Sequence, residues 1–242
     1  MKMWSKLAES KYIDDLLKKV FGSEIVDSFD FTDYEGCTIL HDFNYPISEM
    51  FANKYDVVFD GGPLEHIFNF PTAVANSLYM VKEGGYFISI SPTNNFCGHG
   101  FYQFSPELWY RVLNKNNGFE IKKMILYVDR PETPFYLVRD PEECYLRVGL
   151  VNAYPTYLFV LAQKMKHNKL FEVMPQQSDY VRLWHLEYEG PQSRVPIDDK
   201  EGVGKWLVYI KVMLFNLAKW VGIKKDYLGK VYFAQAFSRI EL

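Results

Sequence analysis

Apolar runs separated by glycine, proline and polar clusters predict alternating strands and helices over the first two-thirds of the chain. Residues 55–60, YDVVFD, read as a buried strand that Gly61-Gly62-Pro63 ends. A helical stretch follows, and residues 85–90 then form a second strand. Two strands joined through a helix make a βαβ unit, which predicts that they lie parallel in one sheet.

The other apolar patterns extend this arrangement in both directions. Pro71 suits the first turn of a helix over 70–80, and Ser105-Pro106-Glu107 is a helix opening with an N-cap serine. The remaining predicted elements are a helix within 2–20, strands at 24–30 and 36–41, a helical turn at 47–52, a helix to about 114, and strands at 119–128 and 154–162.

This order predicts an α/β fold, a three-layer sandwich around a mostly parallel sheet, in residues 1–165. The strands ending near Asp30, His41, Asp60 and Ile90 should form that sheet. Residues 130–147 carry prolines and charges and are interpreted as a lid or insertion over the site. Residues 166–242 are predicted to be a C-terminal extension, polar and loop-rich to 200, with an apolar helix near 203–221. That helix is expected to pack on the domain or to mediate a homo-oligomer.

Composition narrows the class of protein further. A chain of 242 residues with 48% hydrophobic and 17% aromatic residues is not a disordered protein. The net charge of −3 gives no electrostatic footprint for nucleic acid, so no nucleic-acid partner is expected. No uncharged apolar stretch reaches 18 residues, so no transmembrane segment is expected. Three cysteines make an odd number, which favours a reducing, cytoplasmic location.

Polar residues follow both strands of the βαβ unit. In open parallel sheets, ligands bind beyond the carboxyl ends of the strands, where such residues collect on one rim. The candidates here are Asp60, Glu65 and His66 after the first strand and Asn94, Asn95 and His99 after the second.

Three sequence segments resemble the small-molecule methyltransferase domains of the class I S-adenosylmethionine-dependent family. They are YDVVFDGGPLEHIFNF, GGYFISISP and GHGFYQFSPELWYRVL. The resemblance spans roughly residues 12–165. It implies a Rossmann-like sheet whose last strand is antiparallel, S-adenosylmethionine as cofactor, and a small-molecule or saccharide acceptor.

The resemblance also implies where the cofactor lies. Asp30, at the end of the second family strand, would take the ribose hydroxyls, because a carboxylate accepts two hydrogen bonds. Asp42 and Phe43 would hold adenine, and Asp60 with Gly61 would lie beside the methyl group. Asp30 as a turn cap and Asp42 in an Asx-turn are the structural alternatives.

Methyl transfer to a hydroxyl or protonated amine needs a base, and histidine titrates near neutral pH. His66 is the first candidate and His99 the second, with a purely structural histidine as the alternative for each. Glu65 completes the catalytic candidates. Glu65 and His66 also suit a divalent metal ion, but the spacing shows no third ligand, so no metal is expected.

The chain departs from the family before Asp30. No glycine-rich turn of the GxGxG type, which holds the methionine part of the cofactor in the family, occurs there. Three explanations are open for the missing turn: a shortened form of the family fold, an N-terminal segment that takes the place of the missing strand, or a scaffold that binds no cofactor. We expect either direct pairing of the strands ending at Asp30 and Asp60 or a shortened chain, with a cofactor site that is incomplete on its methionine side. The function expected is methyl transfer; the alternative is an inactive domain that binds or regulates a partner.

Overall fold

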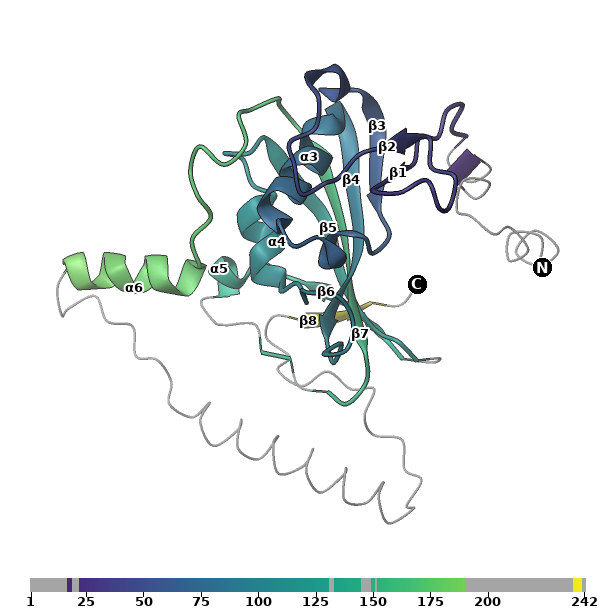
Figure 1. The fold of residues 1–242 in the computed structure, drawn as a ribbon. Helices are drawn as coiled ribbons and strands as arrows, with labels where there is room; N and C mark the ends of the chain where they lie inside the picture. Colours follow the sequence, from purple (N-terminus) through teal and green to yellow (C-terminus); the bar gives the residue numbers. More distant parts are fainter. Residues whose placement is uncertain are drawn as a thin grey trace, which may run out of the picture.

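The computed structural model describes residues 17–18, 22–130, 133–144, 149–150, 152–189 and 237–240 (Figure 1). Its strands are β1 (Phe29–Asp30), β2 (Ile39–Leu40), β3 (Tyr55–Asp60), β4 (Val81–Asn94), β5 (Phe119–Val128), β6 (Phe135–Val138), β7 (Thr156–Lys164) and β8 (Phe237–Ile240). Its helices are η1 (Glu49–Phe51), η2 (Leu64–His66), α3 (Phe70–Met80), α4 (Pro106–Val112), α5 (Pro141–Cys144) and α6 (Ser178–Glu189).

The main sheet has six strands in the order β3-β4-β7-β5-β6-β8. β3 pairs with β4 in parallel, whereas β7 lies antiparallel between β4 and β5, and β6 and β8 continue antiparallel. The predicted α/β class and the antiparallel last strand are confirmed. The prediction of a mostly parallel sheet is wrong for the described residues, because β7 inserts against its neighbours and β6 folds back on β5.

β1 and β2 form a small parallel sheet of their own, next to β3 (Figure 1). The predicted direct pairing of the strands ending at Asp30 and Asp60 is therefore wrong. Side chains join the two sheets instead: the Phe29 ring lies 6.1 Å from the Tyr55 ring, and the Tyr55 hydroxyl donates to Asp27 at 2.7 Å. Val57 is 37% exposed, so β3 lies partly at the surface of the sheet.

The hydrophobic core lies on one face of the main sheet. Alternate residues of β4, β5 and β7 point to this face, as the two-residue period of a strand requires. They pack against α3 and α4 in a cluster that includes Val74, Leu78, Phe87, Trp109, Met124, Leu126, Leu158 and Val160. On the opposite face, Ile88 and Ile90 are only half-buried. The described residues thus show two of the three predicted layers.

Sequence patterns predicted several elements closely. α3 spans the expected 70–80, β5 spans 119–128, and the Ser105 hydroxyl accepts the N–H of Leu108 at the start of α4. Of the segment 130–147, expected to be a lid or insertion over the site, residues 135–138 form β6, which pairs with β5 and is separated from β4 by β7 and β5, so this part does not cover the ends of β3 and β4.

The predicted C-terminal extension contains both expected and unexpected parts. α6 occupies part of the segment expected to be loop, and β8 adds a strand to the main sheet. The predicted helix near 203–221, with its role in a homo-oligomer, lies outside the described residues, as does most of the predicted helix within 2–20. Among the helices that the structure describes, none has the length and apolarity needed to cross a membrane.

Lys164 links α3 to the centre of the sheet. Its side chain is buried, and its ammonium donates to the carbonyls of Leu78 at 3.1 Å and Val81 at 2.8 Å. The last carbonyls of a helix lack intrahelical partners, and a lysine satisfies them here. Burial lowers the pKa of Lys164 to about 8. This bond network holds the end of α3 where β4 begins.

Replacing Lys164 with methionine should destabilise the protein, because the buried carbonyls would lose their donor. The expected loss in the free energy of unfolding is about 2–3 kcal/mol, measured by urea denaturation. Lys166→Met, at an exposed position two residues further along, is the control and should stay within about 0.5 kcal/mol of the parent. Equal stability of both variants would show that Lys164 is not a structural link.

Candidate functional site

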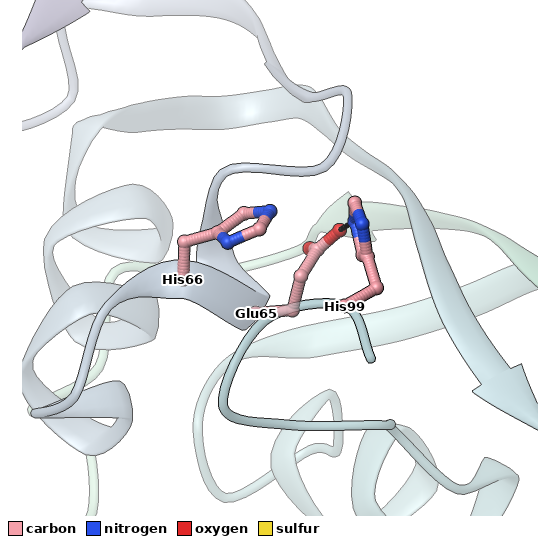
Figure 2. Close-up of side chains that lie close together, drawn as sticks. All are labelled: Glu65, His66 and His99. Atoms are coloured by element: carbon pink, nitrogen blue, oxygen red, sulfur yellow. Dashed lines mark ion pairs between the residues drawn. The ribbon is translucent and has the colours of Figure 1, made fainter. Parts of the chain in front are cut away.

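Two loops meet at the carboxyl end of the parallel β3–β4 pair. One loop, residues 61–69, follows β3 and contains η2; the other, residues 95–105, follows β4. Because the strands run in the same direction, both loops leave the sheet at the same edge, as predicted. Figure 2 shows Glu65, His66 and His99 projecting toward one another from these loops.

Asp60 fixes the first loop to the sheet. It is the buried last residue of β3, and its carboxylate accepts the Ser89 hydroxyl of β4 at 2.6 Å. The other carboxylate oxygen accepts the N–H groups of Gly62 at 3.2 Å and Leu64 at 3.3 Å. Burial raises the pKa of Asp60, and these three hydrogen bonds oppose that shift. Both oxygens therefore hold the loop in place.

Glu65 is clamped by the second loop. Its carbonyl accepts the N–H groups of Phe101 at 2.7 Å and Tyr102 at 3.2 Å. Gly100 has a φ of +68°, and a β-carbon there would lie 2.8 Å from the same carbonyl oxygen. Only glycine fits both the backbone conformation and the close approach. Gly100, in the segment Gly98-His99-Gly100, thus allows the second loop to lie directly over the first.

The side chains of Glu65, His66 and His99 form one cluster. One possible ligand atom from each side chain lies within 4.8 Å of those from the other two. The Nε2 atom of His99 is 3.4 Å from Oε1 of Glu65, and the two imidazole rings are 4.7 Å apart. Glu65 is buried, whereas both histidines are exposed. Burial raises the pKa of Glu65 to about 7, and the negative charge of Asp60 adds to the shift.

This cluster changes the interpretation of the metal-binding residues. The sequence spacing showed no third ligand beside Glu65 and His66, but the structure brings His99 to them from the second loop. Two imidazoles and one carboxylate are a donor set that binds divalent transition metals. The three predicted catalytic candidates are therefore neighbours.

Asn152 supports the second loop and was not singled out in the sequence. Its side-chain oxygen accepts from the amides of Asn94 at 2.9 Å and Asn95 at 2.7 Å, and its own amide donates to Thr156 at 2.6 Å. Asn95 has a φ of +62°, a conformation that asparagine tolerates better than most residues. No local pattern marks Asn152, because the asparagines that it binds, Asn94 and Asn95, are distant in the sequence.

The predicted cofactor residues Asp30 and Asp42 lie at the ends of β1 and β2. Because these strands are parallel, both acids emerge at the same end of the small sheet. Asp30 accepts the N–H of Thr32 at 2.8 Å, and Asp42 accepts the N–H of Asn44 at 2.9 Å. Both acids thus have the local turn roles given as structural alternatives.

The Asp42 turn is connected to the site. Asn44 exchanges two hydrogen bonds of 2.9 Å with Asn69, the residue before α3 and three residues after His66. Phe43 is half-buried and packs on the core, with its ring 5.8 Å from Phe29. Gly61 follows Asp60 in the first loop, where a β-carbon would meet the Phe59 ring at 2.9 Å. All predicted site residues therefore lie on connected segments at the strand ends.

Comparisons with known proteins give little further information. No protein-family model matches the sequence, and no curated protein matches it. Among solved structures, the chain is similar to a Bacillus halodurans C-125 protein described as a putative methyltransferase. The two are 13% identical, with a TM-score of 0.39, over 62% of this chain and 87% of that chain. A likeness this slight assigns neither fold nor activity.

The role of Asp60 can be tested on β3 itself. Asp60→Ala should lower the free energy of unfolding by about 2–4 kcal/mol, because a buried hydroxyl and two N–H groups lose their acceptor. Asp60→Asn should lose less, since its amide oxygen can still accept from the loop. Asp56→Ala is the control: its carboxylate is 84% exposed, and its surface ion pair with Lys82 contributes at most about 1 kcal/mol. A loss at Asp60 no larger than at Asp56 would contradict this account.

Two glycines flank His99, and they should respond differently to alanine. Gly100→Ala should cost about 1–3 kcal/mol of stability through strain at a positive φ, and should also move His99 away from Glu65. Gly98→Ala is the matched control, because a β-carbon there meets no atom within 4 Å. Thermal unfolding and the His99 NMR shifts report the two effects, and parent-like behaviour of Gly100→Ala would show that the loops are not in close contact.

Proposed function

We propose that the chain is an S-adenosylmethionine-dependent methyltransferase that acts on a small molecule or a sugar. The observation that carries this proposal is the grouping of Glu65, His66 and His99 at the carboxyl end of the parallel β3–β4 pair. These residues belong to the sequence segments that resemble the family. Ligands of open α/β sheets bind at this edge.

The cofactor would lie along the ends of β1, β2 and β3. Asp30 would accept the ribose hydroxyls, while Asp42 and the backbone of Phe43 would hold adenine. The hydrogen bonds between Asn44 and Asn69 support this assignment, since they tie the adenine side to the loop that carries His66. Asp60 and Gly61 would border the methyl group, with Asp60 acting as a positioning residue through its bonds to the loop.

The reaction would be an in-line displacement at the sulfonium methyl group. The acceptor must be oriented and must lose a proton, and both tasks suit an imidazole beside a carboxylate. His66 and His99 are exposed at the rim, where an acceptor can reach them, and Glu65 would orient His99. The exposed rings of Phe68 and Phe101, 5.7 Å apart edge to face, would form an apolar wall for the acceptor.

A second candidate function is that of an inactive domain that binds a partner. The outer edge of β3 favours it, since no strand among the described residues forms backbone hydrogen bonds with that edge, and a partner could pair there. The two functions differ in whether the chain binds the cofactor.

Calorimetric titration with S-adenosylhomocysteine tests the proposal directly. The parent should bind, and Asp30→Ala should bind more weakly by about 1–3 kcal/mol, roughly 5- to 150-fold, because the ribose hydroxyls lose their acceptor. Asp30→Asn keeps the turn acceptor for Thr32 and should also bind more weakly. Asp33→Ala, at an exposed position of the same turn, is the control and should match the parent.

Three results would overturn parts of this account. Failure of the parent to bind would remove the methyltransferase proposal and favour the inactive domain. Equal affinity of the parent and both Asp30 variants would remove Asp30 from the cofactor site. Weakened binding by Asp33→Ala would show that the turn as a whole, and not the Asp30 carboxylate, determines affinity.

A further inference from the structure

We infer that Glu65, His66 and His99 form a binding site for a divalent transition-metal ion of the zinc type. The cluster already has part of the geometry of such a site. In a tetrahedral zinc site with bonds of about 2.0 Å, neighbouring ligand atoms lie about 3.3 Å apart. The Nε2 atom of His99 and Oε1 of Glu65 are 3.4 Å apart, and one possible ligand atom from each side chain lies within 4.8 Å of those from the other two.

A second observation points to a missing ligand at this place. Glu65 is only 2% exposed, yet its Oε2 atom has no hydrogen-bond partner among the described residues. A buried carboxylate oxygen without a donor is costly, and buried charges in proteins are usually paired or coordinate metals. Oε1 is the oxygen that lies beside His99, so a cation bound to both oxygens of the carboxylate would also satisfy Oε2. The orphaned atom thus indicates an occupant with positive charge.

The ligand residues are held before any metal arrives. The carbonyl of Glu65 is fixed by the N–H groups of Phe101 and Tyr102, and Gly100 lets the second loop approach it. On the other side, a β-carbon at Gly62 would lie 3.1 Å from Oε1 of Glu65, so the first loop closes around the carboxylate. Rigid support of this kind lowers the reorganisation that metal binding requires.

The donor set selects the class of metal. Imidazole suits zinc and other late first-row ions, whereas magnesium and calcium prefer sites made of oxygen ligands. Three protein ligands leave a coordination position open, as in catalytic rather than structural zinc sites. Both histidines are exposed, so this position would face solvent and the acceptor.

The chemical role of the ion rests on the proposed function, while the site itself does not. If the chain is a methyltransferase, the metal would replace an imidazole base: it would bind the acceptor hydroxyl and lower its pKa, so that the hydroxyl proton passes to solvent water. It would also neutralise the charge that develops on that oxygen. Without the transferase activity, the three residues would still bind the ion.

The test is metal titration of the full chain after removal of bound metal with a chelator. Isothermal titration with Zn²⁺ should give one tight site, whereas Mg²⁺ should bind at least about 100-fold more weakly. Glu65→Gln, His66→Gln and His99→Gln should each weaken Zn²⁺ binding at least about tenfold, since each removes a direct ligand. Circular dichroism of each variant shows that it is folded.

Cys97→Ser is the matched control for adventitious binding. Cys97 is an exposed free thiol two residues before His99, and it is not part of the cluster. Its variant should keep the parent affinity. Co²⁺ in place of Zn²⁺ should give an absorption spectrum with nitrogen and oxygen ligands and no thiolate band.

The inference is wrong if the parent has no Zn²⁺ site, if the three variants bind as the parent does, or if only Cys97→Ser loses binding. The titration uses neither S-adenosylhomocysteine nor an acceptor. Its failure would therefore leave the cofactor-binding test unaffected, and failure of cofactor binding would leave a measured metal site in place.

Discussion

The candidate site depends on the register of one strand pair. In the parallel pairing of β3 with β4, Asp60 lies opposite Ser89, and their side chains are joined by a hydrogen bond of 2.6 Å. The same carboxylate accepts two N–H groups of the following loop. A shift of one residue would turn Asp60 to the other face and release the loop. The pairing of β3 with β4 therefore determines where the loop that carries Glu65 and His66 lies.

Packing of the second loop on the first buries the carboxyl group of Glu65, which is energetically unfavourable. Glu65 is buried beside the negative charge of Asp60, and burial raises its pKa to about 7. A core that served stability alone would hold an apolar residue here, since an unpaired buried carboxylate is costly. Local rules are broken most often at functional sites, where other parts of the fold offset the cost. In this chain, the clamp by Phe101 and Tyr102 and the bonds of Asp60 offset it.

Sequence reasoning succeeded where the signal was local and failed where long-range pairing decided the outcome. Pro71 and the Ser105 cap marked α3 and α4 because helix starts have a chemistry of their own. The glycines after Asp60 marked the end of β3, and the polar residues beyond it led to Glu65 and His66. The separate β1–β2 sheet was missed because its two-residue strands join β3 through aromatic side chains rather than backbone bonds. The contact of His99 with Glu65 and the hydrogen bond of Asn152 with Asn95 followed only from the fold, because the two residues of each pair are far apart in the sequence.

A crystal structure of the full chain grown with Zn²⁺, with anomalous data at the zinc absorption edge, tests most directly whether the two loops build a single site. The account predicts one strong peak about 2.0–2.2 Å from the carboxylate of Glu65 and from one nitrogen each of His66 and His99. Well-ordered loops without a peak between these side chains, or with His99 turned away from Glu65, would contradict it.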